Sequence, residues 1–387
     1  MDKKIVALCG VLLFGVSFYA TQSLVSSSSP SSPLMQDSIT EVTQPSASSD
    51  GVKTVFTGAK SETCPLNGEK LTKEERSLWE RRRPLVVMIE NHVDARPQSG
   101  LSQADVIYEA VAEGGITRFA TVFYCKDAPY IGPVRSARMY YIDFASEYGK
   151  NPLYAHVGGA NTPGPADALG KLRTINWAGY NDLNQFSIPF PYFFRDYERL
   201  PNRATEHTMY SSTKKLWDFA REKRGLSDTD KKGTSWDKGF VSWEFKDDEP
   251  ASTPSAPSVK FGFWDGGSDY IVTWKYQSTG NRYVRSQNGV PHVDKNTSKP
   301  LTTRNIVVQF TRESPANDGY PGGHIIYKTI GTGKGIVFQD GTAADITWSK
   351  KDQFARTIYT TKQGDEVKFN GGKIWVEIVP EGNTVTY

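Results

Sequence analysis

Short runs of apolar or alternating residues, separated by glycine-rich turns, fill the last third of this 387-residue chain. Such runs predict β-strands, because successive side chains of a strand point to opposite faces of a sheet. We expect strands at residues 259–263, 270–276, 282–286, 305–310, 324–330, 335–340, 343–349 and 373–380. Residues 259–387 are therefore predicted to form a mostly antiparallel β domain.

Residues 61–225 combine strand and helix patterns and predict a mixed α/β domain. The patterns of strands occur at 85–89, 106–112, 119–124 and 154–157, and those of helices at 71–83, 136–148 and 211–224. The first helix should begin at Thr72, because Thr followed three positions later by Glu75 is a capping box. Residues 226–258, which are polar and then Pro/Ser-rich, are the expected linker, so the fold class is α+β.

The N-terminus has the pattern of an export signal. Lys3 and Lys4 precede an apolar run from residue 5 to 20, and a stretch rich in Ser, Pro and Thr follows. We expect residues 1–25 to be an uncleaved signal anchor, with a cleaved signal peptide as the alternative, and 26–60 to be a Ser/Pro-rich disordered linker. The rest of the chain would then lie outside the cytoplasm on the cell membrane, or be secreted if cleavage occurs.

Two cysteines lie outside the apolar run, Cys64 and Cys125. In an oxidising compartment they are expected to form a disulfide, and the alternative is two unpaired buried thiols. A zinc site is not expected, since neither cysteine has a second ligand at short spacing. We predict no other metal and no cofactor.

The charge balance argues against nucleic-acid binding. The chain has 46 Lys and Arg against 43 Asp and Glu, which gives a formal charge of +3 at pH 7. Apart from the three arginines at 81–83 it has no basic block, whereas nucleic-acid binding needs clustered positive charge. These three arginines end the first predicted helix and are expected to face solvent.

The segment 91–141 places several arginines beside glycine, proline or small residues and among strand patterns, as expected of a site for an anionic ligand. Its sequence GPVRSAR, residues 132–138, should form a strand-to-helix turn with Ser136 as the cap. Free N–H groups at a helix start, flanked by Arg135 and Arg138, attract a phosphate or carboxylate. The alternative is a purely structural arginine pair.

The predicted ligand-binding set in this segment also includes Ser136, Asn91, Arg96, Arg118 and Glu109. Glu109 and Glu113 would share one face of a helix or of a strand. Paired carboxylates can bind a metal or raise one another's pKa for acid-base chemistry. The alternative is a structural network in which these carboxylates pair with the arginines.

His156 and His207 are candidates for a general base or a metal ligand, because each lies beside a turn or an expected helix start, and His207 is also placed in the predicted ligand-binding set. A lone histidine at a strand end is more often a hydrogen-bonded structural residue. No G-x-S-x-G motif supports a serine hydrolase. The glycine-rich stretch 331–335 lacks phosphate-loop spacing and is expected to be a β-turn.

Two further groups are expected to be structural. His292 and Asp294 should stabilise a turn, with a pocket in the second domain as the alternative. The aromatic-rich segment 177–197 should pack in the core, although stacking on the sugars of a glycan is the alternative.

Long motifs resemble those of the YerB-like family. In the first half these are ARPQSGLSQADVIYE, EGGITR and GPVRSAR, and in the second half they are YVRSQNGVPHVDKNTSKPLTTRNIVVQ, GTGKGIVFQDG and the strands around Trp348 and Trp375. The resemblance implies an N-terminal and a C-terminal YerB domain in an extracytoplasmic, membrane-attached protein of unknown function, of a kind often described as lipoproteins. This chain departs from that pattern, since Leu8 precedes Cys9 inside the apolar run and leaves no usable lipobox.

The function predicted from these features is binding of an anionic cell-envelope ligand, a phosphate- or carboxylate-bearing glycan or a prenyl phosphate, through Arg118, Arg135 and Arg138. The pattern is loosely similar to the arginine-bearing strand ends of LytR-CpsA-Psr enzymes, which transfer polymers from prenyl pyrophosphate carriers. If the protein is an enzyme, Glu113 or His156 would be the catalytic base and the arginines would stabilise a transferred phosphoryl group. The alternative is a non-catalytic scaffold that docks another envelope protein.

Overall fold

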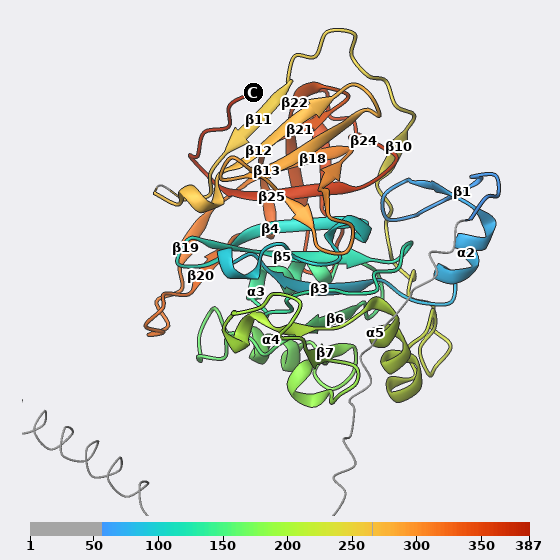
Figure 1. Ribbon diagram of the computed structural model, residues 1–387, viewed down its shortest axis with the longest axis vertical. Helices are drawn as coiled ribbons and strands as arrows, with labels where there is room; N and C mark the ends of the chain where they lie inside the picture. The colour runs from blue at the N-terminus through green and yellow to red at the C-terminus, as the bar shows by residue number, and fades with distance from the viewer. Residues whose placement is uncertain (1–55, 265) are drawn as a thin grey trace, which may run out of the picture. The chain divides into compact units, whose positions relative to one another are not determined.

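The computed structural model describes residues 56–264 and 266–387, and strands dominate both ranges (Figure 1). The α-helices are short: α2 (Lys73–Trp79), α3 (Met139–Ala145), α4 (Ala168–Thr174) and α5 (Thr213–Phe219), which continues into a π-helical turn at Ala220–Arg224. The α2 capping box predicted at Thr72 is present, with Thr72 and Glu75 bonded in both directions. No helix within the described ranges is long and apolar enough to cross a membrane. The expected anchor, and the expected linker up to residue 55, lie outside these ranges.

A ten-stranded sheet forms the centre of the fold. Its order is β23-β22-β21-β18-β25-β4-β5-β3-β6-β7. The strands are β3 (Leu85–Glu90), β4 (Val106–Glu113), β5 (Ile116–Phe123), β6 (Leu153–His156), β7 (Asp182–Asn184), β18 (Asn305–Thr311), β21 (Gly331–Gln339), β22 (Thr342–Lys350), β23 (Ile358–Thr361) and β25 (Ile374–Pro380).

A smaller antiparallel sheet and several short hairpins complete the fold. The smaller sheet contains β11 (Ser258–Phe261), β12 (Val272–Gln277), β13 (Arg282–Gln287), β14 (Val290–Pro291) and β17 (Thr302–Thr303). The two-stranded pairs are β1 (Glu62–Thr63) with β2 (Lys70–Leu71), β8 (Phe194–Arg195) with β9 (Met209–Tyr210), β10 (Glu244–Lys246) with β24 (Lys368–Asn370), β15 (Val293–Asp294) with β16 (Lys299–Pro300), and β19 (Glu313–Pro315) with β20 (Ile325–Tyr327).

The large sheet is shared by the two halves of the chain. Figure 1 shows β25, near the C-terminus, beside β4 of the first half, and the two strands pair in parallel with Ile374 opposite Val106. Strand β25 is also parallel to β18, so the second half is not purely antiparallel. The two expected domains therefore do not have separate sheets, and the predicted boundaries stay a prediction.

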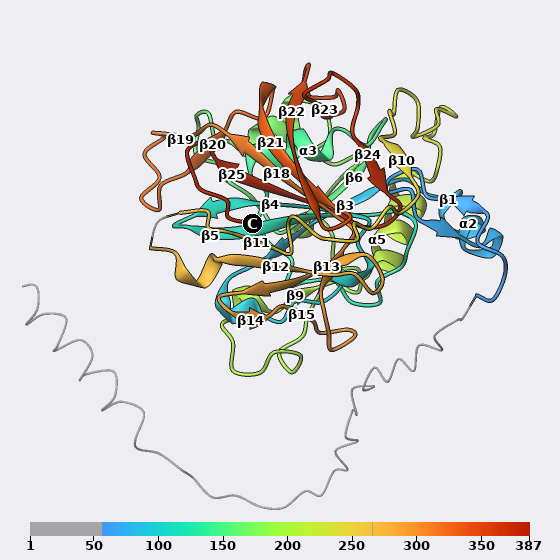
Figure 2. The ribbon, with the colours of Figure 1, turned by 90° about the horizontal axis from the view of Figure 1, so that it is seen from above.

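Alternation along β4 gives the sheet two buried faces. The ring of Tyr108 stacks on Phe144 of α3 with 4.7 Å between centroids, whereas the next residue, Glu109, reaches Arg285 of β13 on the other side. Trp274 of β12 packs edge to face on Trp375 of β25 at 5.1 Å. Figure 2 shows the resulting layers, with α3 on one side of β4 and β5 and the β11–β13 strands on the other.

Each strand pattern predicted from the sequence coincides with an observed strand, but three local expectations are wrong. Residues 331–335 begin strand β21 and pair with β22, where glycine at 333 leaves room for the Trp348 ring. Arg82 and Arg83 are buried: Arg82 stacks 3.7 Å above the Trp217 ring, and Arg83 donates to the Ser227 carbonyl at 2.6 Å. The third wrong expectation is Ser136 as the cap of α3, which instead begins at Met139.

Candidate functional site

The predicted arginine site is closed by ion pairs. Arg118 donates to one oxygen of Glu113 at 3.1 Å, and Arg138 donates to the other oxygen through Nε at 2.9 Å. Arg118 is 3% exposed and Arg138 7% exposed. Burial acts to raise the pKa of Glu113, but the charges and hydrogen bonds of the two arginines lower it to about 2. Glu113 is thus a charged partner of the arginines, and such a carboxylate is a poor general base at neutral pH.

Ser136 does not cap α3. The N-cap is Arg138, with no side-chain cap bond, and the helix begins at Met139. The Ser136 carbonyl instead accepts a hydrogen bond from Arg118 at 3.0 Å, which keeps this stretch extended. Arg135 is more exposed, yet its Nε donates to Glu90 at 3.1 Å. The expected arrangement of helix N–H groups beside two free arginines is therefore absent at this turn.

Glu109 lies apart from Glu113, in a buried network around Arg285. The guanidinium of Arg285 donates to Glu109 at 2.6 Å and to Glu377 at 2.8 Å, and all three side chains are 0% exposed. Burial and the charge of Glu109 hold the pKa of Glu377 well above its usual range. The network connects β4, β13 and β25, so it joins the two halves of the chain.

Asn91 and Arg96 belong to the same network. The Asn91 amide donates to Glu109 at 3.2 Å and to Thr117 at 2.7 Å, while Arg96 donates to the Asn91 side-chain oxygen at 3.1 Å. Asn91 is 0% exposed. Because protein groups take up these donors and acceptors, the network holds the structure together and leaves Asn91 no surface for a ligand.

The two predicted histidines have different surroundings. His156 is 0% exposed, and both ring nitrogens are bonded, Nε2 to Asp182 at 2.7 Å and Nδ1 to the Gly158 carbonyl at 2.6 Å. This matches the structural interpretation of His156. His207 bonds through Nδ1 to Glu90 at 2.9 Å, and its ring stacks on His92.

His292 and Asp294 bridge the two halves, which goes beyond stabilising a turn. His292 Nε2 contacts Gln98 at 2.8 Å, and Asp294 accepts from the backbone N–H of Ser102 at 2.6 Å. Burial and the charge of Arg285 lower the pKa of His292 well below its usual range. The expectation that the aromatic segment packs in the core holds only in part: Trp177 is buried, but Phe186 and Phe190 are each 77% exposed and Tyr197 is 53% exposed.

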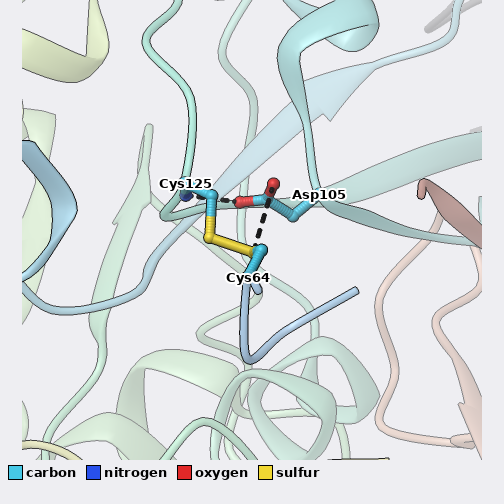
Figure 3. Close-up of side chains that lie close together, drawn as sticks. All are labelled: Cys64, Asp105 and Cys125. Carbon is cyan, nitrogen blue, oxygen red and sulfur yellow. Dashed lines mark hydrogen bonds between the residues drawn. A yellow bond between two sulfur atoms is a disulfide. The ribbon is translucent and has the colours of Figure 1, made fainter. Parts of the chain in front are cut away.

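The predicted disulfide is present between Cys64 and Cys125, whose Cα atoms are 6.1 Å apart. Figure 3 shows Asp105 beside it, accepting from the Cys125 N–H at 2.9 Å. Asp105 is 0% exposed, and burial raises its pKa to about 6 against the opposing effect of these backbone bonds. The disulfide attaches the β1–β2 hairpin to the end of β5.

This hairpin forms one wall of a basic cavity that the sequence analysis missed. The cavity has a volume of about 880 Å³, within the usual range for ligand pockets. Its lining contains seven basic and three acidic side chains. The basic ones are Lys60, Lys70, Lys126, Lys246, Arg282, Arg304 and Lys373, and the acidic ones are Glu69, Asp247 and Asp248.

Four of the seven cations lack an acidic partner. Within the described ranges, no carboxylate lies within 4.0 Å of Lys60, Lys70, Arg282 or Lys373. Among the residues that the structure describes, the amine of Lys373 donates only to the Leu101 carbonyl. Burial, and then the charge of Lys126, lowers the pKa of Lys373 to about 8. An anion in the cavity would relieve this unfavourable electrostatic environment.

The cavity is built from segments that are far apart in the chain. Its lining includes residues from β1 and η2 (Leu101–Gln103) in the first half, and from β10, β13, β17 and the β24–β25 turn. Gly372 in that turn has a φ of 134°, and a side chain there would strike Arg304. No local motif marks such a site, because its cations are scattered singly along the sequence.

Comparisons with known proteins agree with the motifs. Residues 66–227 match the model described as "Protein of unknown function (DUF3048) N-terminal domain", and residues 259–376 match the model of the C-terminal domain. The chain is 30% identical over 325 residues to "Putative lipoprotein YerB" of Bacillus subtilis (strain 168), covering 84% of this chain and 88% of that protein. The crystal structure of YerB from Bacillus subtilis superposes with a TM-score of 0.66 at 26% identity, covering 84% of this chain and 100% of that one. The chain therefore belongs to the YerB-like family of proteins of unknown function, as its motifs predict.

Proposed function

We propose that this protein acts outside the cytoplasm, attached to the cell membrane, and binds an anionic cell-envelope ligand in the basic cavity. The name of the Bacillus subtilis relative, "Putative lipoprotein YerB", supports this location. The ligand class is the one expected from the sequence, a phosphate- or carboxylate-bearing glycan or a prenyl phosphate. Its place is different, since the arginines expected to bind it are occupied by Glu113 and Glu90.

One observation carries the proposal: a cavity of about 880 Å³ whose lining has four more basic than acidic side chains. Charges that line a concave surface act together on an anion, and Lys and Arg are the usual partners of phosphate and carboxylate groups. The lining also includes hydroxyls of Ser102, Thr302 and Thr303, which suit an oxygen-rich ligand.

Calorimetric titration of the purified full chain tests the proposal. The probes are inorganic pyrophosphate, farnesyl pyrophosphate and a muramyl peptide, which separate a phosphate head group, a prenyl phosphate and a carboxylate-bearing glycan fragment. We expect saturable binding of at least one probe, weakened about tenfold or more by Arg282→Ala combined with Lys70→Ala, because each charged contact contributes roughly 1–3 kcal/mol.

Arg135→Ala is the matched control, since it removes one partly exposed arginine from the other candidate site. It should leave the dissociation constant within about twofold of the parent. If Arg135→Ala abolishes binding while the cavity variant binds normally, the ligand lies at the GPVRSAR turn. If no probe binds the parent, the anionic-ligand function is wrong.

The scaffold alternative is favoured by one observation. Phe186 and Phe190 are each 77% exposed, whereas most large apolar side chains of this protein are buried. Exposed aromatic side chains are frequent anchors of protein interfaces. In this alternative, Phe186→Ser combined with Phe190→Ser would abolish an envelope complex detected by cross-linking in intact cells, and the cavity variant would leave the complex unchanged.

A further inference from the structure

A cluster of two histidines and a carboxylate lies apart from the basic cavity, whose lining includes none of its members. His92 and Asp94 belong to the start of a 3-10 turn at Val93–Ala95, and His207 ends another at Thr205–His207. One potential ligand atom from each of the three residues lies within 4.8 Å of the others. The two imidazole rings are nearly parallel, with centroids 4.9 Å apart.

His207 is oriented in the way that metal-binding histidines usually are. Its Nδ1 lies 2.9 Å from Glu90 Oε2, and both side chains are nearly fully buried, at 7% and 5% exposed. Since the carboxylate only accepts, Nδ1 is the nitrogen that donates, and in the neutral imidazole the lone pair is then on Nε2. A carboxylate behind a histidine fixes the tautomer and increases the basicity of the nitrogen that faces the metal.

His92 and Asp94 provide the second and third ligands. His92 Nδ1 accepts a hydrogen bond from the Asp94 N–H at 3.2 Å and lies 3.7 Å from Asp94 Oδ2, so a metal bound at this nitrogen would replace that hydrogen bond. Metal–ligand distances of about 2.0–2.2 Å require the ligand atoms to approach one another to roughly 3.3 Å. The Asp94 side chain, 47% exposed, has room to make this adjustment.

We propose that His92, Asp94 and His207 bind a first-row divalent transition metal, with Glu90 as the positioning carboxylate. Two imidazoles and one carboxylate are a ligand set suited to Zn²⁺ and neighbouring ions, and hard ions such as Mg²⁺ prefer oxygen alone. Three protein ligands leave a position open for water or for a further ligand. The proposal reverses the expectation that the chain binds no metal.

Two arginines lie close to the cluster, and each already pairs with a carboxylate. Arg135 contacts Glu90 at 3.1 Å, and Arg203 contacts the other oxygen of Asp94 at 3.6 Å. Arg203 is 37% exposed and therefore able to turn away when a cation arrives. The ligands face solvent through His92, which gives the ion a path of entry.

Metal titration of the untagged full chain, stripped with a chelator and kept without reductant, tests this site. We expect uptake of one equivalent of Co²⁺ with visible absorption bands typical of a low-coordinate site, and displacement of Co²⁺ by Zn²⁺. His92→Ala and Asp94→Asn should each weaken binding about tenfold or more. Both positions are partly exposed, so their variants should unfold at the parent temperature.

His324→Ala is the matched control, because His324 also pairs with a carboxylate, Asp318, at 2.7 Å. It should bind Co²⁺ like the parent. The site is refuted if the parent takes up no stoichiometric metal, if both cluster variants bind as the parent does, or if only His324→Ala loses the ion. Binding of the anionic probes at the basic cavity is measured separately, so failure of one proposal is distinguishable from failure of the other.

Discussion

Replacing Arg285 by Met should destabilise the protein strongly without opening any surface site. The guanidinium is 0% exposed, and it provides the positive charge between Glu109 and Glu377 while lying 4.6 Å above the Trp375 ring. Methionine keeps much of the volume but leaves a carboxylate buried without a counter-charge. Removing one partner of a buried ion pair typically costs about 3–5 kcal/mol.

The size of the folded part converts this cost into a shift of the melting temperature. With an unfolding entropy of roughly 2.1 cal/mol/K per residue, about 330 residues give roughly 0.7 kcal/mol/K, so the expected fall is about 4–7 °C. Differential scanning calorimetry at pH 7 measures it, and urea unfolding followed by tryptophan fluorescence gives the change in free energy.

A second substitution separates charge from packing. Arg285→Met combined with Glu109→Gln should recover at least half of the lost stability, because glutamine keeps an acceptor for Thr117 and carries no charge. Arg282→Met, an exposed position in the same strand, should change stability by no more than about 0.5 kcal/mol. A cost below about 1 kcal/mol for Arg285→Met, or strictly additive effects in the double variant, would refute the account of the network.

The remaining predictions concern acid stability, ligand binding and the disulfide. Glu113 has a folded-state pKa of about 2 against 4.5 in the unfolded chain. Its contribution to the free energy of unfolding is therefore complete above pH 4.5 and is lost as the pH falls toward 2. Glu113→Gln should flatten the fall in melting temperature between these two pH values. Lys373 has a pKa of about 8, so its amine loses its positive charge between pH 7 and 9. Anion binding in the cavity should therefore weaken over this range in calorimetric titrations. The variant Lys373→Gln should bind the anion less tightly and lose this pH dependence. Reduction of Cys64–Cys125 should lower the free energy of unfolding by about 4 kcal/mol in urea titrations, because the bond closes a loop with a sequence separation of 61 residues. Reduction should also weaken ligand binding, whereas a disulfide variant with unchanged affinity would contradict the role of the β1–β2 hairpin as a cavity wall.

The sequence alone determined the local elements and the family. Strands such as β4 and β18 were predictable because their apolar patterns are local, and the start of α2 because Thr72 and Glu75 bond to their own turn. The disulfide was predictable because Cys64 and Cys125 are the two cysteines outside the apolar N-terminal run. The motifs identified the relatives because they are long, and that inference needs no three-dimensional contact.

Only the tertiary structure decided which charged groups meet. Glu109 pairs with Arg285, 176 positions later in the chain, because β13 of the smaller sheet packs over β4 and β25 of the large sheet. Long-range packing also brings separate lysines and arginines to one basic cavity. Within the first half, the β4–β5 hairpin places Arg118 beside Glu113, and the segment before α3 adds Arg138. Periodicity shows which face of a strand is apolar, but it contains no information on which distant strand covers that face, and the free energy of burying a charge depends on that partner.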